Sequence, residues 1–532
     1  MIQHTCRLLR RTTTLVAFAF LLIVLTAASN TASAQDRILR ADHSIAQTID
    51  AHTAPAEGGL FIQLNMYDSL YRYTGNPPKL IPWLATGHTV SADGLTWEYS
   101  IREDVKFHDG ARLSADDVVY SFHRALALKN SPAAVFRTIM KPENVTAPAP
   151  NKVRFVISKP FAPFHSAIPL IAIVNSKLVK QHEENGDWGE KWLSANGAGS
   201  GAYKMVAGSF RPQEEIELVY NADYFQKWPQ NPIKRVHARY TRELSTSMLA
   251  LLKGDIDISS PRLPGEQYER IKSNPSLVPS LEPAMRIFLF TMNTKKPPLD
   301  NVHVRRAISY AFNYDGFIAQ ILSGISKRNP GPLPSTMWGY PPDLQAYSYD
   351  LAKAKEELEK ARQQGANLDA EIEFMALAGT EETVQAALLL QSELRKLGLK
   401  MKINTATFYS ITGMTSKPDS TPAMWAHWVS TYYVDPDNWI GQMYHSDFHG
   451  TWKGSAWYKN PKVDAVLAEA RTSVNQGKRE SLYHEAMRMV VADAPAVWIY
   501  DTVQIRAVKK DLGGYAFSPI GSGTEFWRMY WK

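Results

Sequence analysis

Residues 425–444 read WAHWVSTYYVDPDNWIGQMY, and this stretch decides the fold expected for the second half of the chain. Six of its twenty residues are aromatic, or 30%, against 11% for the whole chain. A proline follows Asp435, and the residue before a proline is kept out of the right-handed helical region. The pattern therefore predicts a strand over residues 423–429, then a loop, and a short helix that opens near Asp437.

Aromatic side chains on a loop at the end of a strand are well placed to line a ligand cleft, because they offer a flat surface with a polar tip. We expect the ligand site to include five residues of this stretch: Trp425, Trp428, Tyr432, Tyr433 and Asn438. The alternative for each aromatic residue is a place in the core of a large domain. Asn438 and Asp435 either set the geometry of the loop or bind ligand, and for Asp435 we favour loop geometry.

The residues before this stretch alternate strand and helix patterns. A strand is predicted at 372–375, a helix capped by Thr380 and stopped at Gly398, and a returning strand at 399–403. A strand, a helix and a strand in this order predict a parallel βαβ unit. Asp350 is expected to cap another helix just upstream.

The first half of the chain predicts a smaller unit. Residues 96–101 and 152–157 alternate apolar and polar side chains, as half-buried strands do. Between them, Ser114 and Asp117 have the spacing of a capping box at the start of a helix. Antiparallel strands with one helix predict a small α+β unit.

A second strand–helix–strand pattern follows it. The strand is predicted at 236–240, the helix at 246–253, and the last strand at 255–258. This order predicts parallel pairing. Asp255 and Asp257 would then share one strand face, where we expect a structural role rather than paired acid–base chemistry.

The first 34 residues are predicted to be a cleavable export signal. Three arginines precede an apolar run at 15–28, and the small residues 32–34 fit a cleavage site before Gln35. A membrane-spanning helix needs about 20 apolar residues, so a retained anchor is the weaker alternative. We expect a mature protein in the periplasm.

Cysteine usage supports this expectation. Cys6 is the only cysteine of the chain and is lost on cleavage. It does not lie at the cleavage site, so the protein is not expected to be a lipoprotein. The mature chain would have no disulfide, and large apolar cores alone would have to stabilise it in an oxidising compartment.

Charge and length narrow the class of protein. The formal charge of +7 includes three arginines of the signal and no acid from residues 1–34, which leaves 7 − 3 = +4 for the mature chain. The basic residues are scattered, whereas a nucleic-acid interface needs a concentrated stripe. We therefore expect no nucleic-acid partner. A length of 532 residues suggests about three domains.

Motifs of catalysis are absent from the sequence. It contains no Gly-x-Ser-x-Gly elbow, no Walker loop, no His-Glu-x-x-His and no cysteine in the mature chain. We expect a protein that is not an enzyme and holds no cofactor. His445 and His449, with Asp447 between them, have a spacing that fits metal ligands on a helix, but the surrounding residues predict a solvated loop. His108 precedes a turn and is expected at the surface.

Several segments, taken together and in order, resemble the large periplasmic solute-binding proteins of peptide-type ABC importers, the oligopeptide, dipeptide and nickel class. The resemblance covers essentially all of residues 35–532. The segments that carry it are LIPWLATGHTVSADGLTWEYSIR (80–102), VKFHDGARLSADDVVYSF (105–122), SGAY (200–203), NADYF (221–225), ALLKGDIDI (250–258), Asn293, VRRAISYAFNYD (304–315), 349–361 and 460–495.

The resemblance implies an α/β fold, a two-lobed periplasmic-binding-protein clamshell of the large type II-like cluster with an extra small α+β domain. Lobe I would be discontinuous along the chain. The implied division is signal peptide 1–34, lobe I 35–74, inserted small domain 75–190, lobe I again 191–284, lobe II 285–495, and a C-terminal return to lobe I at 496–532.

The implied function is capture of a small peptide or peptide-like solute between the lobes, by a monomer that delivers it to membrane permease subunits with cytoplasmic ATPases. Solute binding would shift an equilibrium between open and closed forms. The alternatives are the same role for an opine-like conjugate, a glycoside or a chelated metal, a secreted hydrolase, or a chaperone-like use of the cleft.

One residue departs from the family pattern. In peptide-binding members, an aspartate three residues before the DPDN-like segment holds the α-amino group of the ligand. Aligned on residues 435–438, that position is Tyr432, and no acid lies between His427 and Val434. A buried ammonium needs a carboxylate partner, so a free peptide N-terminus would have to be held in another way. The usual tryptophan has a near-equivalent in Trp428, one place out of register.

Overall fold

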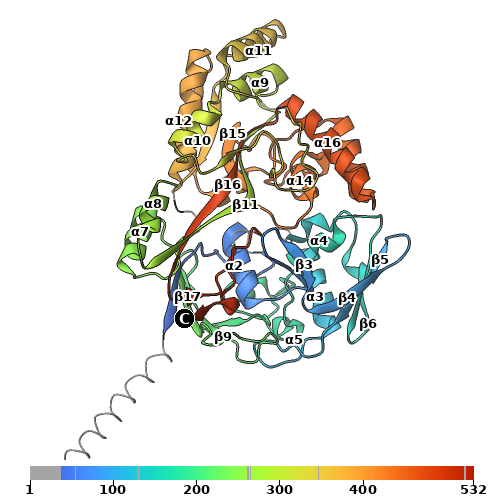
Figure 1. The fold of residues 1–532 in the computed structure, drawn as a ribbon. Helices are drawn as coiled ribbons and strands as arrows, with labels where there is room; N and C mark the ends of the chain where they lie inside the picture. Colours follow the sequence, from blue (N-terminus) through green and yellow to red (C-terminus); the bar gives the residue numbers. More distant parts are fainter. Residues whose placement is uncertain are drawn as a thin grey trace, which may run out of the picture.

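The computed structural model describes residues 37–53, 56–128, 132–260, 263, 265–345, 347–520 and 523–532. The predicted signal segment and its cleavage site lie outside the described residues. The described chain forms two bodies, one above the other in the view of Figure 1, and each body contains β-sheet structure of its own. We refer to them as the upper and lower bodies.

The upper body is built on a six-stranded mixed sheet of order β12-β16-β11-β15-β13-β14. In that order the strands are Lys327–Arg328, Ala496–Lys509, Leu277–Met292, Met424–Val429, Ile372–Leu377 and Met401–Ala406. Helices cover both faces of this sheet: α9 (Val302–Ala311), α10 (Tyr314–Gln320), α11 (Leu351–Gln363) and α12 (Glu381–Lys396) pack on one, and α14 (Ile440–Tyr444), α15 (Pro461–Thr472) and α16 (Gln476–Asp493) on the other.

Strand β11 shows how two covered faces shape the sequence. Phe288 and Phe290 belong to the apolar core on one face, and Ile287 and Leu289 to the core on the other. A strand buried on both sides needs a nearly continuous apolar run rather than alternation. Strand β15 is equally enclosed, and it lies within one residue of the strand predicted at 423–429.

The predicted βαβ unit is present, with β13 and β14 paired in parallel and α12 as the crossover. The returning strand begins at Met401 rather than at residue 399. Thr380 is the N-cap residue of α12, as predicted, but its side chain makes no capping hydrogen bond. Glu381 and Glu382 occupy the first turn instead, where negative charge complements the positive end of the helix dipole.

The lower body contains two four-stranded sheets, of order β1-β10-β9-β8 and β4-β5-β7-β6. The first comprises Ile38–Asp42, Arg235–Arg239, Glu215–Tyr220 and Tyr203–Met205, and the second Ala85–Val90, Thr96–Ile101, Lys152–Val156 and Val145–Ala149. The other elements are α2 (Ala56–Met66), the hairpin β2–β3 (Tyr71–Thr74, Lys79–Pro82), α3 (Ala115–Ala127), α4 (Phe164–Ala167), α5 (Ser176–Lys180), α6 (Glu190–Leu193) and the pair β17–β18 (Leu512–Gly513, Tyr530–Trp531).

The second of these sheets, together with α3, is the predicted α+β unit. Its strands pair antiparallel throughout. The expected capping box forms at the start of α3, where the backbone N–H of Ser114 donates to Asp117 Oδ2 at 2.9 Å. One apolar core runs from this unit into the first sheet.

The strand predicted at 255–258 is not formed. Helix α7 (Leu244–Lys253) ends at Gly254 in the left-handed region, as expected, but only Ile258 then makes isolated bridges, parallel to Ala41 and antiparallel to Val508. Asp257 is buried whereas Asp255 is exposed, so they do not share an environment. Residues 255–258 do not form a strand because Ile258 bridges two different sheets, through Ala41 of β1 and Val508 of β16, instead of extending one of them.

A two-stranded ribbon joins the upper and lower bodies. Strands β11 and β16, of 16 and 14 residues, pair from Thr291–Ala496 in the upper sheet down to Leu277–Lys509. The lower end packs against α7 and α8 (Tyr268–Lys272). The register shifts after Pro283, where Met285 has a φ of 42°. Such an irregularity bends a strand and increases its twist.

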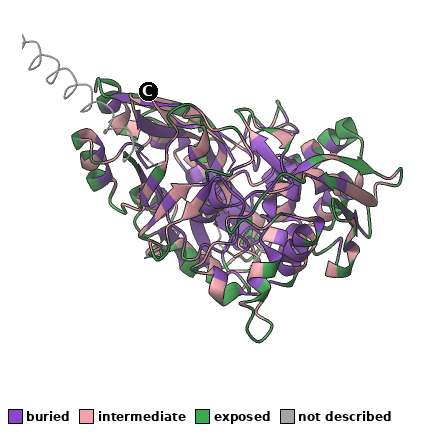
Figure 2. Ribbon diagram, turned by 90° about the horizontal axis from the view of Figure 1, so that it is seen from below, coloured by how far each residue is buried: buried purple, intermediate pink, exposed green. Residues whose placement is uncertain are grey.

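Buried residues fill the interior, and exposed residues lie along the outer helices and loops, as Figure 2 shows from below. Within the described part of the chain, no helix combines the length and the apolar character that crossing a membrane requires.

Candidate binding cavity between the two bodies

A cavity of about 720 Å³ is lined by residues of both bodies. On the upper side, its wall is made by residues 377–382 and 407–409 and by Trp428, Ser430 and Tyr432. These segments follow β13, β14 and β15, which run parallel to one another. Ligands of α/β sheets bind outside the carboxyl ends of parallel strands, because the loops that follow the strands meet there. On the lower side, loops after β1 and β10 complete the wall, including Ser44 and Tyr240.

The five predicted site residues are placed differently. Trp428 and Tyr432 line the cavity, whereas Trp425, Tyr433 and Asn438 do not. Contact of any of them with a ligand stays a prediction.

Trp425 is fully buried in the upper body. Its ring stacks on His427 at 3.8 Å, and its Nε1 donates to Ser455 Oγ at 3.0 Å. Burial lowers the pKa of His427 to about 3, so this imidazole is neutral, with Nε2 2.7 Å from Thr291 Oγ1. The geometry is that of a packed core, in keeping with the alternative weighed for each aromatic residue.

Trp428 belongs to a polar chain at the cavity wall. Its Nε1 donates to the Tyr500 hydroxyl at 3.1 Å, and that hydroxyl donates to Glu382 Oε1. The guanidinium of Arg286 lies over the Trp428 ring, 5.0 Å from its centroid. Glu382, Arg286 and Tyr500 also line the cavity.

Sequence reasoning missed Glu382, Arg286 and Tyr500. They come from α12, β11 and β16, three elements that are distant along the chain. The only local signal was the acidic pair Glu381–Glu382, which also fits a helix that needs negative charge in its first turn.

Tyr432 lies beside a buried lysine. The Lys453 ammonium is 4.9 Å from the centroid of the Tyr432 ring, and it donates to Asn438 O at 2.8 Å and to Gln442 Oε1 at 2.6 Å. Burial lowers the pKa of Lys453 to about 7. Asn438 also donates from Nδ2 to Ser430 O at 3.0 Å. In this structure Asn438 therefore fixes the loop and the lysine.

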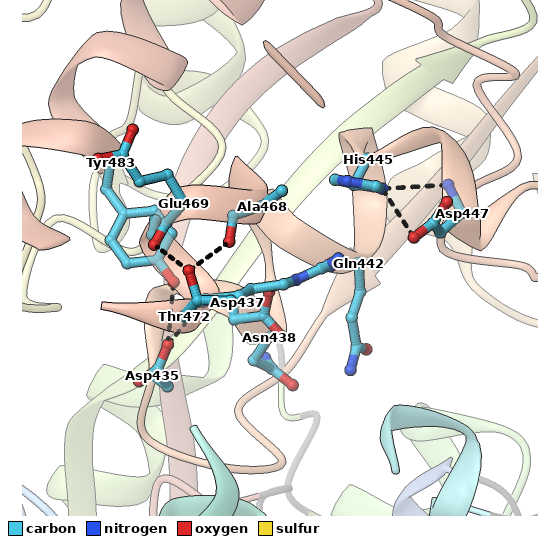
Figure 3. A network of polar contacts seen from close by, with 12 residues as sticks. Asp435, Asp437, Asn438, Gln442, His445, Asp447, Ala468, Glu469, Thr472 and Tyr483 are labelled. Carbon is cyan, nitrogen blue, oxygen red and sulfur yellow. Dashed lines mark hydrogen bonds and ion pairs between the residues drawn. The ribbon is translucent and has the colours of Figure 1, made fainter. Parts of the chain in front are cut away.

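The DPDN segment is held by two arginines. Asp435 accepts two hydrogen bonds of 2.8 Å from Arg479, and Asp437 accepts one of 2.5 Å from Arg471. The Tyr483 hydroxyl donates to Asp435, and Figure 3 shows Tyr483 and Asp435 pointing toward each other, with Asp437 nearby. Burial raises the pKa of Asp435, and the charge of Arg479 opposes the rise. Asp435 thus sets loop geometry, as favoured from the sequence.

Tyr433 belongs to the same network. Its hydroxyl donates to Asp437 Oδ2 at 2.9 Å, and its ring is buried. The short helix predicted near Asp437 is a single 3₁₀ turn, η5 (Pro436–Asn438), followed by α14.

The histidines expected in loops are less exposed than predicted. His445 is 7% exposed and accepts from the Asp447 backbone N–H at 3.1 Å, so the prediction of a solvated position is wrong for it. His449 Nε2 lies 2.7 Å from Tyr458 O. His108, expected at the surface, is half-buried 3.0 Å from Gly201 O, and burial lowers its pKa to about 4. In the described ranges, no three His, Cys, Asp or Glu residues gather as metal ligands.

Comparison of the sequence with known proteins identifies the family of this chain. Residues 79–450 match the model for the bacterial extracellular solute-binding proteins, family 5 Middle. The probable D,D-dipeptide-binding periplasmic protein DdpA of Escherichia coli K12 is 30% identical over 82% of this chain and 82% of its own. The dipeptide-binding protein of Escherichia coli K12 is 28% identical over 86% of this chain and 87% of its own.

Solved structures share the fold. The ABC transporter-associated periplasmic binding protein DppA from Helicobacter pylori, in complex with the peptide STSA, superposes with a TM-score of 0.82 at 24% identity. The alignment covers 93% of this chain and 98% of that one. The predicted α/β two-lobed clamshell is therefore confirmed. The chain belongs to the bacterial extracellular solute-binding proteins of family 5.

Proposed function

We propose that this protein is the periplasmic solute-binding subunit of an ABC importer, which captures a peptide or peptide-like solute between its two bodies. The observation that carries the proposal is the cavity of about 720 Å³ with walls from both bodies. Relatives and solved structures similar to this chain bear the names of a probable D,D-dipeptide-binding periplasmic protein, a dipeptide-binding protein and an oligopeptide-binding protein. The protein then binds and releases its solute without chemical turnover.

Closure around the solute uses the β11–β16 ribbon as its hinge. The register shift after Pro283 lies on this ribbon, and Ala284 and Arg286 beside it line the cavity. A solute that contacts both walls has extra affinity for the closed form, and so it shifts the equilibrium toward closure. The boundary proposed between lobe I and lobe II, at residues 284 and 285, falls at this irregularity.

The remaining boundaries are proposed as the resemblance implies them, with lobe I formed by 35–74, 191–284 and 496–532 and the small domain by 75–190. Strand β16 begins in the upper sheet at Ala496, so the C-terminal return to lobe I takes place along this strand. The exported chain is a monomer, cleaved before Gln35 and not lipid-modified. Its partners are permease subunits with cytoplasmic ATPases.

Native mass spectrometry tests this function. The protein is expressed with its signal in a bacterial periplasm, purified without refolding, and then denatured to release and identify any added mass. A peptide or a series of peptides is the expected result. A single non-peptide mass, such as an opine-like conjugate, a glycoside or a chelated metal, would overturn the peptide assignment while leaving the transport role.

Conversion of the bound solute into a product on incubation would overturn the role as a binding protein. In that case the hydrolase alternative would replace it.

A further inference from the structure

We infer that Glu382 receives a positively charged ammonium group of the solute. The inference rests on the proposed function in one respect, that the cavity is where the solute binds. It adds to that function that the solute carries a positive charge where it meets the upper wall of the cavity.

Four carboxylate side chains line the cavity, and they differ in exposure. Glu243, Glu266 and Glu381 are exposed, whereas Glu382 is partly buried. An exposed carboxylate stays hydrated and gains little from an opposite charge. A carboxylate withdrawn from water interacts more strongly, because the local dielectric constant is lower. Glu382 is therefore the acid of this cavity that gains most from a bound cation.

The hydrogen bonds of Glu382 leave one oxygen available. Tyr500 donates to Oε1, and Trp428 in turn donates to the Tyr500 hydroxyl at 3.1 Å, so the carboxylate is anchored through a buried phenol. The bond from Tyr500 is the only hydrogen bond of the Glu382 side chain to the described residues. Oε2 can accept from a solute without breaking any contact of the resting protein.

The charge of Glu382 is incompletely balanced. Burial raises its pKa to about 7, while the Tyr500 hydrogen bond and the charge of Arg286 oppose that rise. Among the residues described, no lysine or arginine forms an ion pair with Glu382. A solute ammonium beside Oε2 would supply the counter-charge and favour the ionised carboxylate.

Different solutes carry this chemistry. A peptide contributes its N-terminal ammonium or a lysine-like side chain, and a non-peptide solute contributes an alkylammonium group. All of them donate N–H groups from a positively charged nitrogen, which is the property that Oε2 recognises.

The experiment compares Glu382→Gln with Glu381→Gln. Both glutamates lie in the first turn of α12 and line the cavity, and they differ in burial. Isothermal titration uses Ala-Ala, D-Ala-D-Ala and Ala-Ala-Ala, each with a free and with an N-acetylated amino group. Native mass spectrometry of the three proteins from periplasm is run in parallel. Circular dichroism and thermal melting establish that the variants fold.

We expect the wild type to bind peptides with a free amino group more tightly than acetylated peptides. Glu382→Gln should bind the free-amine peptides about 10- to 100-fold more weakly than the wild type, which is the range for a hydrogen bond to a charged group. Glu381→Gln should change it less than about threefold, as exposed charges do. Acetylated peptides should bind both variants like the wild type. Glu382→Asp, which keeps the charge, should recover part of the affinity.

Two results would overturn the inference while the peptide function stands: equal affinity for free and acetylated peptides, or unchanged affinity in Glu382→Gln. If no peptide binds and the co-purified mass is a non-peptide solute, the peptide assignment fails by itself. The inference then holds if that solute carries an amine and is depleted from Glu382→Gln, and it falls if the solute has no cationic group.

Discussion

The upper body contains two kinds of acidic site, and they are built in opposite ways. Asp435 and Asp437 lie in the DPDN loop, and each accepts hydrogen bonds from an arginine of the same chain. Glu382 lies at the cavity wall, with a tyrosine hydroxyl as its hydrogen-bond partner. A carboxylate that holds the fold together needs its counter-charge at all times. One that binds a cationic solute has to leave that place open until the solute arrives.

Removal of Arg479 should produce the largest effect. Arg479→Met leaves Asp435 buried without its cation, and breaking such a pair costs about 3–5 kcal/mol of the free energy of unfolding. Urea denaturation of the solute-free protein measures the change. Arg488→Ala, which breaks the exposed pair with Asp343, is the control and should cost less than about 1 kcal/mol. If both variants lost the same free energy of unfolding, the buried pair of Asp435 would contribute no more to the fold than an exposed pair does.

Glu382→Gln should change the pH dependence of stability. The pKa of Glu382 is about 7 in the folded protein against 4.5 in the unfolded chain. The folded state therefore holds the extra proton between these values, and its stability falls as pH rises from about 4.5 through about 7. The variant lacks this loss, so its stability relative to wild type should grow over that range, by about 1–3 kcal/mol at about 1.4 kcal/mol per pKa unit.

Thermal melting of the solute-free proteins at pH 5 and pH 8 measures this difference. A constant difference for Glu382→Gln would mean that its carboxylate is already balanced in the resting protein.

Trp428→Ala should weaken solute binding by about 1–3 kcal/mol if its ring contacts the solute, as truncation of an aromatic anchor does. The control is Trp192→Ala, a half-buried tryptophan of the lower body that stacks on His182 and does not line the cavity. Titration with the co-purified solute gives both affinities. Unchanged affinity in a folded Trp428 variant would remove this residue from the site.

Tyr500→Phe should have the smallest effect. It removes the hydroxyl that donates to Glu382, and we expect a loss of about 1 kcal/mol in affinity for an amine-bearing peptide, the net value of one hydrogen bond. The loss should shrink when Glu382→Gln is already present, because the two residues act together. Additive losses in this double-mutant cycle would show that Tyr500 does not act through the carboxylate.

Local signals were enough to predict many elements correctly. The Asp350 side chain accepts from the backbone N–H groups of Ala352 and Lys353, and Gly254 ends α7 with a φ of 82°. The strand ending at Val429 and the break at Asp435 were also predicted correctly. Caps, stops and proline restrictions act within a few residues, so the sequence states them directly.

The segments that resemble the family were likewise visible in the sequence, and this resemblance implied the two-lobed fold. The acidic, aromatic and apolar patterns were also visible in the chain alone. Tertiary structure decided the rest. Only the packing of three distant elements brings Glu382, Arg286 and Tyr500 to one wall. It also places Trp428 at the cavity and Trp425, three residues earlier, in the core. Whether a residue reaches the cavity or the core depends on which end of its strand faces the gap between the bodies. Contacts between distant parts of the chain determine this orientation, and local propensity does not.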